Sequence, residues 1–148
     1  MFTFRLEPLI TLRDNELKEC QKKLANAYSV RRALEENLQD IDKQLAEGMN
    51  TVRNLMQTGQ KINARYLLGF RQQEMFLRFE HGKLTQQIEE VDKKIELFRA
   101  EVIEANKELK IVEKLKEKRH EKYLEDEKGQ ETKTMNEISG NRRTQRRV

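Results

Sequence analysis

The fold is decided by residues 6–55, which read LEPLITLRDNELKECQKKLANAYSVRRALEENLQDIDKQLAEGMNTVRNL. Apolar residues recur along this stretch at alternating spacings of three and four, which places them on one side of an α-helix. We call these positions the seam, and 12 of the 15 are apolar: Leu6, Ile10, Leu17, Cys20, Leu24, Ala27, Leu34, Leu38, Ile41, Leu45, Val52 and Leu55. A repeat sustained over this length predicts a helix that packs lengthwise against another helix.

A second stretch, residues 67–112, carries the same repeat, with 12 of its 14 seam positions apolar. Between the two stretches lies the polar sequence QTGQK at residues 57–61, which contains a glycine and is typical of a turn. We therefore predict an all-α fold in which two long helices form an antiparallel coiled coil, an α-helical hairpin. Folding the chain at this turn pairs residues whose numbers add up to 122, so that Ile10 meets Val112.

The boundaries of the hairpin follow from local signals. Pro8 fits only the first turn of a helix, so the first helix is predicted at 8–56, followed by a turn at 57–63 and a second helix at 64–128. Residues 1–128 would form the coiled-coil domain, in which 117–128 overhang without a partner. The remaining residues, 129–148, are predicted to be a disordered basic tail, because the helical pattern fades after a glycine.

Several seam positions are polar. We expect the long arginine side chains at positions 13 and 31 to reach from the seam into water. Glu74 should face Gly48 and leave a loosely packed layer near the turn, and His81 should face Ile41. No second metal ligand lies near His81 in the predicted hairpin, so these layers are interpreted as determinants of register.

The outer face of the second helix carries apolar residues near the turn, where nothing else in the chain covers them. We call this set, with two methionines that flank it on the first helix, the tip surface: Leu68, Met75, Phe76, Phe79, Met49 and Met56. Contiguous exposed apolar side chains on a soluble protein mark a binding site for a partner. The alternatives are packing against a second copy of the chain and coverage by the loop.

The composition excludes several classes of protein. Charged residues make up 38% of the chain, and no apolar run approaches the ~18 residues of a membrane span. The first residues lack the pattern of a signal peptide, so a cytosolic location is expected. No phosphate-binding glycine loop and no zinc-ligand spacing are found. We expect neither catalytic residues nor a metal or cofactor, and hence no enzyme.

Charge is uneven along the chain. The formal net charge is +4, and the last ten residues contribute four arginines and no acid, so the preceding residues balance 26 basic against 26 acidic side chains. Such a tail could bind nucleic acid weakly and in a salt-sensitive way. Because the helices carry no basic stripe with interleaved aromatic residues, no specific nucleic-acid partner is expected.

Both ends of the chain resemble the family of the flagellar export protein FliJ. The opening of that family is similar to Phe4-Arg5-Leu6-Glu7, Leu9-Ile10 and Leu12-Arg13. Its closing signature resembles Glu113-Lys114-Leu115, Glu117-Lys118, Tyr123, Glu127, Glu131, Lys133 and Met135-Asn136-Glu137-Ile138. Pro8, Asn136 and the arginine-rich end depart from the family pattern, and the resemblance covers nearly the whole length.

The resemblance implies a soluble component of the flagellar type III export apparatus. Members of the family bind the hexameric export ATPase in the manner of a γ stalk, the cytoplasmic domain of the export gate, and escort chaperones. The protein would then lie at the cytoplasmic face of the inner membrane and meet the membrane only indirectly. The tip surface would face the gate, and the end that holds both termini would face the ATPase through Phe4, Arg5, Glu113, Lys114 and Tyr123.

Other interpretations of the same pattern stay open. The equivalent stalk protein of a virulence injectisome shares the expected fold and the ATPase partner. A general coiled-coil scaffold would need no ATPase at all. A weak nucleic-acid binder would act through the arginine tail alone.

Overall fold

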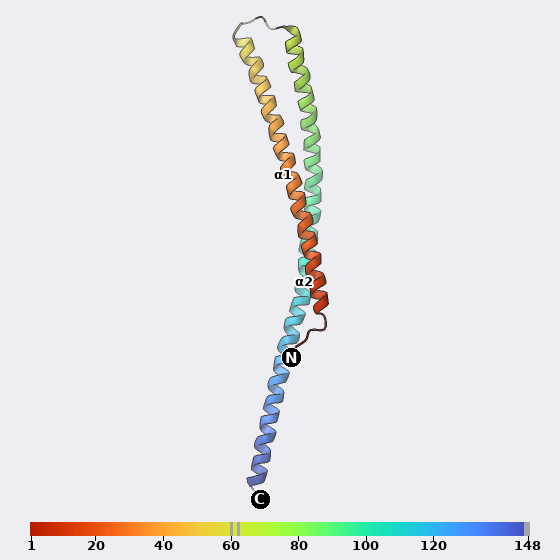
Figure 1. Cartoon of the computed structure of the whole chain (residues 1–148), viewed down its shortest axis with the longest axis vertical. Helices are drawn as coiled ribbons and strands as arrows, with labels where there is room; N and C mark the ends of the chain where they lie inside the picture. The colour runs from red at the N-terminus through yellow and green to blue at the C-terminus, as the bar shows by residue number, and fades with distance from the viewer. Residues whose placement is uncertain (60, 62, 147–148) are drawn as a thin grey trace. The chain divides into compact units, whose positions relative to one another are not determined.

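The protein folds into two long helices that pack against each other in opposite directions. The computed structural model describes the backbone of residues 1–59, 61 and 63–146, and the side chains up to residue 141. Helix α1 spans Glu7–Gln57 and helix α2 spans Ala64–Arg146 (Figure 1). Within the described residues there is no strand. The predicted all-α helical hairpin is confirmed.

Local chemistry explains where the helices begin and end. Pro8 lies in the first turn of α1, as predicted, because its missing N–H would have no partner there. After α1, Gly59 adopts a positive φ of 68°, a backbone conformation that strains any residue with a Cβ. Helix α2 begins after Asn63, whose side-chain oxygen accepts a hydrogen bond from the amide of Arg65 at 3.1 Å and caps the helix.

Cross-helix ion pairs report the register of the seam. The residue numbers add up to 121 for Arg13 with Glu108. They add up to 123 for Arg31 with Asp92, for His81 with Asp42 and for Lys116 with Glu7. All four values lie within one of the predicted 122, so the heptad pattern and the turn together specified the pairing.

Two compact units make up the chain. One unit contains residues 1–19 and the chain from Val102 onward, and the other contains Cys20–Glu101. In the first unit the buried apolar residues are Phe4, Leu17, Ala105, Leu109 and Val112, and in the second they are Ala27, Leu77, Leu84 and Ile95. Among the described residues no large side chain is less than 2% exposed, because a pair of helices encloses its seam from two sides only.

Two features of the first unit differ from the prediction. Helix α2 continues past Gly129 to Arg146, whereas the sequence analysis ended it at 128. A single glycine costs a helix only about 1 kcal/mol relative to alanine, and the following residues include the good helix formers glutamine, glutamate and lysine. The overhang after Lys116 also has a partner, because the N-terminal segment packs on it (Figure 1). The flexibility of 129–148 stays a prediction.

Candidate partner-binding surfaces

The tip surface is exposed in the structure, as the sequence analysis expected. Its six side chains retain between 54% and 69% of their accessible surface. All six belong to the second unit and flank the connection between α1 and α2. Large apolar side chains left this open are available to a partner.

A cleft opens between the helices beside the tip surface. The helices diverge toward the connection (Figure 1), and the cleft has a volume of about 790 Å³. Its apolar walls include Val52, Phe70 and Leu77, and it reaches Met49 and Met56 of the tip surface. The loosely packed layer predicted near the turn therefore exists, but its size as a cleft was not foreseen.

The residue that explains the cleft is Gly48. It occupies a seam position where a large side chain would fill the space, and a Cβ built there would meet no atom within 4 Å. Glu74, its predicted partner, also lines the cleft and accepts a hydrogen bond from Arg78 at 3.0 Å. Two seam positions without an apolar side chain thus leave the layer open.

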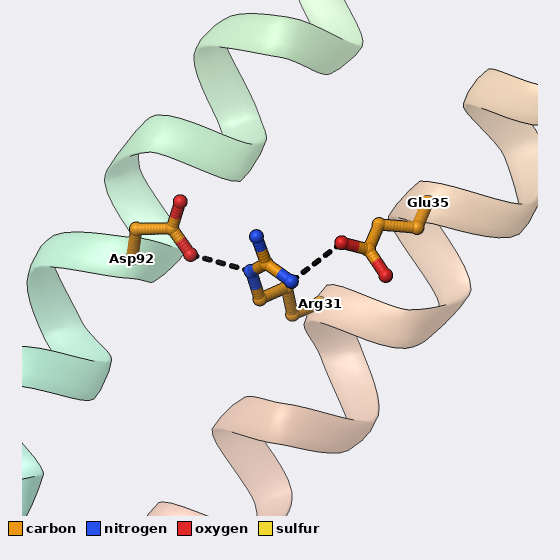
Figure 2. A network of polar contacts seen from close by, with 3 residues as sticks. All are labelled: Arg31, Glu35 and Asp92. Atoms are coloured by element: carbon orange, nitrogen blue, oxygen red, sulfur yellow. Dashed lines mark hydrogen bonds and ion pairs between the residues drawn. The ribbon is translucent and has the colours of Figure 1, made fainter.

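Arg31 forms the clearest polar layer of the seam. Figure 2 shows its guanidinium between Asp92 of α2 and Glu35 of its own helix. Its Nε atom donates to Asp92 at 2.5 Å, and this hydrogen bond is the main cause that raises the pKa of Arg31. The side chain is 36% exposed, so the arginine keeps its charge in contact with water, as predicted.

Arg13 and His81 form similar layers. Arg13 donates to Glu16 at 3.0 Å and pairs with Glu108 of α2 at 3.1 Å; the hydrogen bond to Glu16 is the first cause that raises the pKa of Arg13. Nε2 of His81 lies 3.2 Å from a carboxylate oxygen of Asp42, an ion pair only when the imidazole is protonated. Each polar seam residue of this kind reaches a carboxylate at the edge of the seam.

The N-terminal segment forms a second candidate surface. We call residues 1–6 the strap, because they run in a non-helical conformation along α2. The ring of Phe2 lies edge-on against His120, with centroids 4.8 Å apart, and 5.5 Å from the ring of Tyr123. The guanidinium carbon of Arg119 lies 5.8 Å from the centroid of Phe4, a cation–π contact.

Burial along the strap alternates. Phe4 is 6% exposed, Phe2 and Leu6 are partly buried, and Thr3 and Arg5 are exposed. Residues 1–4 have no regular structure, and Arg5 and Leu6 form a turn that leads into α1, so the alternation comes from a chain that lies with one side on α2. The alternation Phe2-x-Phe4-x-Leu6 is visible in the sequence, but it does not fit a helical repeat and was not part of the prediction.

Tyr123 links the strap to the next turn of α2. The amino group of Met1 donates to the Tyr123 hydroxyl at 3.0 Å, and that hydroxyl donates to Glu127 at 2.8 Å. The hydrogen bond to Glu127 is the main cause that raises the pKa of Tyr123 above its ordinary value. The hydroxyl group of Tyr123 is therefore engaged in two hydrogen bonds, which fix the position of its side chain.

The other residues assigned to the ATPase lie in different settings. Phe4 is buried and contacts Arg119, and Tyr123 is partly buried beside Phe2, whereas Arg5, Glu113 and Lys114 are exposed. Phe4 presents almost no surface to a partner while the strap is in place. Whether any of these five residues binds a partner stays a prediction.

The described residues contain no group of three or more potential metal ligands. Among them, neither helix has an apolar stretch of the length that a membrane span requires. Cys20 is a free, partly buried thiol. The arginine side chains of the tail lie outside the described part of the chain: Arg142, Arg143, Arg146 and Arg147.

Comparison with models of protein families identifies one family whose model matches the sequence. The family model described as flagellar FliJ protein matches residues 1–147, which is nearly the whole chain. No curated protein and no solved structure matches the sequence.

Proposed function

Because the chain belongs to the FliJ family, whose members are components of the flagellar export apparatus, we propose that it is a non-enzymatic binding protein of that apparatus. It binds the hexameric export ATPase in the manner of a γ stalk, the cytoplasmic domain of the export gate, and escort chaperones. The observation that carries the proposal is the pair of separate surfaces, one in each unit.

The ATPase is assigned to the surface around the strap. Arg5, Glu113 and Lys114 are exposed there, and no ion pair within the described part of the chain occupies their charges. Free charges at the rim of an interface steer association and select a partner. Tyr123 and Phe4 contribute by holding the strap on α2.

The gate is assigned to the tip surface. Aromatic and methionine side chains dominate it, and these residue types are enriched in protein interfaces. The adjacent cleft gives a partner side chain a place to insert between the helices. The tip surface therefore combines an open apolar patch with a recess.

The remaining parts of the proposal follow from the same role. Escort chaperones that have released their cargo bind the protein at the export apparatus. It acts in the cytoplasm, associated peripherally with the inner face of the membrane through its partners, in support of flagellum assembly and motility. The match to the flagellar family favours this setting over the virulence injectisome.

The ATPase assignment is tested by mixing the protein with the export ATPase of the same organism. We expect faster ATP turnover and more hexamer, and we expect Arg5→Ala with Lys114→Ala to reduce both. Lys107→Ala, an exposed lysine of the same helix outside the assigned set, is the matched control. If the unaltered protein neither raises ATP turnover nor promotes hexamer formation, the ATPase assignment is contradicted and the interpretation as a coiled-coil scaffold is favoured.

The gate assignment is tested with Phe76→Ala and Phe79→Ala together. If both rings are buried by the gate, the double variant should weaken binding by about tenfold or more, since aromatic anchors carry most of an interface's energy. The control is Leu97→Ala, another apolar residue of α2 that is more than half exposed and lies outside the tip surface. An affinity equal to that of the control would contradict the assignment.

A further inference from the structure

The strap takes the place of α1 on α2 beyond the point where α1 begins. The first residue of α1, Glu7, pairs with Lys116 at 2.8 Å. From there on, the strap reaches Arg119, His120 and Tyr123. Spacings of three and four keep these positions on one face of the helix, so the seam face of α2 stays covered after its helical partner has ended.

The strap covers α2 between Glu117 and Glu127, which we call the extension. The extension continues a helix that is already formed on α1, so it needs no new nucleus, but helical residues without packing gain little from propensity alone and open easily. The extension is highly charged, yet among the described side chains no ion pair joins two of its residues. Its support comes from the strap and from the Tyr123–Glu127 hydrogen bond.

The strap is attached to α2 by two aromatic side chains and by the amino group of Met1. The hydrogen bonds of the backbone near it stay local: the amide of Glu7 donates to the carbonyl of Phe4 at 3.2 Å, and the amide of Leu9 donates to that of Leu6 at 2.9 Å. Its hold on α2 comes from the rings of Phe2 and Phe4 and from the Met1 amino group, which donates to the Tyr123 hydroxyl, and these contacts are lost together if the segment lifts. A contact of this kind is a unit that opens as a whole, as locally unfolding segments do.

We propose that the strap is a reversible clasp whose seating of Phe2 and Phe4 on α2 keeps the extension helical, and whose release lets the extension fray. The clasp belongs to the chain itself and needs no partner. It goes beyond the proposed function, because it assigns Phe2 and Phe4 the role of positioning residues in the free protein. A protein that binds at this end would meet a helix whose order depends on the strap.

Hydrogen exchange of the full chain, followed by mass spectrometry, tests the clasp. The test variant is Phe2→Ala with Phe4→Ala, and the matched control is Thr3→Ala, which alters the exposed residue between the two rings. We expect exchange of the amides at 117–127 to rise by about tenfold or more in the test variant, as a local opening becomes easier. Exchange at 84–98, on the seam of the other unit, should not change.

Two results would overturn the proposal. Equal exchange at 117–127 in the test and control variants would show that the strap does not support the extension. A rise spread equally over the extension and over 84–98 would show that Phe4 stabilises the whole fold instead of acting locally. Phe4→Leu separates a loss of fit from a loss of the fold, since it keeps an apolar side chain and should retain most of the protection. The measurement uses the protein alone, so its failure is distinct from failure of ATPase or gate binding.

Discussion

At the scale of single residues, the seam is interrupted by charged side chains that remain in contact with water. Arg31 reaches two carboxylates while 36% of its side chain remains exposed, and Arg13 does the same with 32%. Ion pairs in such settings contribute little to stability, because water screens them and the long side chains lose freedom. Their value lies in register, since a shift by one heptad would move each arginine away from its carboxylate on α2.

A double-mutant cycle measures that contribution. Arg31→Gln and Asp92→Asn, alone and together, should have nearly additive effects on the free energy of unfolding in denaturant titration, because water screens the pair. Raising the salt concentration should reduce the coupling further. A large coupling that persists at high salt would mean that the pair is far better shielded from water than its exposure indicates.

Tyr123 provides a prediction on pH. Its neutral hydroxyl donates to Glu127, so the pKa of the phenol is raised, and the stabilising bond is complete below the ordinary value of about 10 and is lost as the pH rises through the raised pKa. The titration of Tyr123 is measured as the difference between the absorbance titration of the unaltered chain and that of the Tyr123→Phe variant. Glu127→Gln removes the acceptor charge and should move the transition to lower pH. An unmoved transition would contradict the assigned cause.

At the scale of helices and turns, glycines at two positions act in opposite ways. Gly48 lies within α1 and faces open space, so Gly48→Ala adds helix propensity without a clash. We expect this change to raise the free energy of unfolding by about 0.5–1 kcal/mol in urea or guanidinium titration. A lower stability would show that the cleft is already filled by motion of its walls.

Gly59 is the counterpart in the turn. Its φ of 68° is disfavoured for residues with a Cβ, so Gly59→Ala should lower the free energy of unfolding by about 1 kcal/mol. The same denaturant titration measures both glycine variants, and each serves as the control for the other. Equal effects of the two changes would contradict the separate roles given to them.

The elements also show what could be predicted from the sequence. Pro8 indicated the first turn of α1, Gly59 indicated the connection and the heptad pattern indicated the register, because each acts through local geometry or a long repeat. The tip surface was predictable as the apolar residues that remained outside the seam. The cleft depends on how far the helices relax around Gly48, and the strap depends on contacts between distant parts of the chain. Local pattern does not determine either of these.

At the scale of the whole molecule, the end of α2 contributes length and little stability. The side chains from Leu124 to Asn141 are exposed, and the hydrogen bonds of Thr132 and Thr134 run to carbonyl groups of the same helix. A chain ending after Lys128 should therefore unfold within about 0.5 kcal/mol of the full chain. The helical signal in circular dichroism should be lower in the shortened protein by the amount that the removed helical residues contribute. A large loss of stability would mean that this segment packs elsewhere.

The thin core described above has a consequence for how such sequences diverge. Because no large side chain in the described part of the chain is fully enclosed, a replacement on the seam can relax into solvent and rarely creates a sealed void. Selection then acts on the spacing of apolar and polar positions more than on the identity of each residue. Two homologous proteins can therefore keep the same hairpin at low sequence identity. Their homology is then recognised from the pattern of apolar and polar positions along the whole chain.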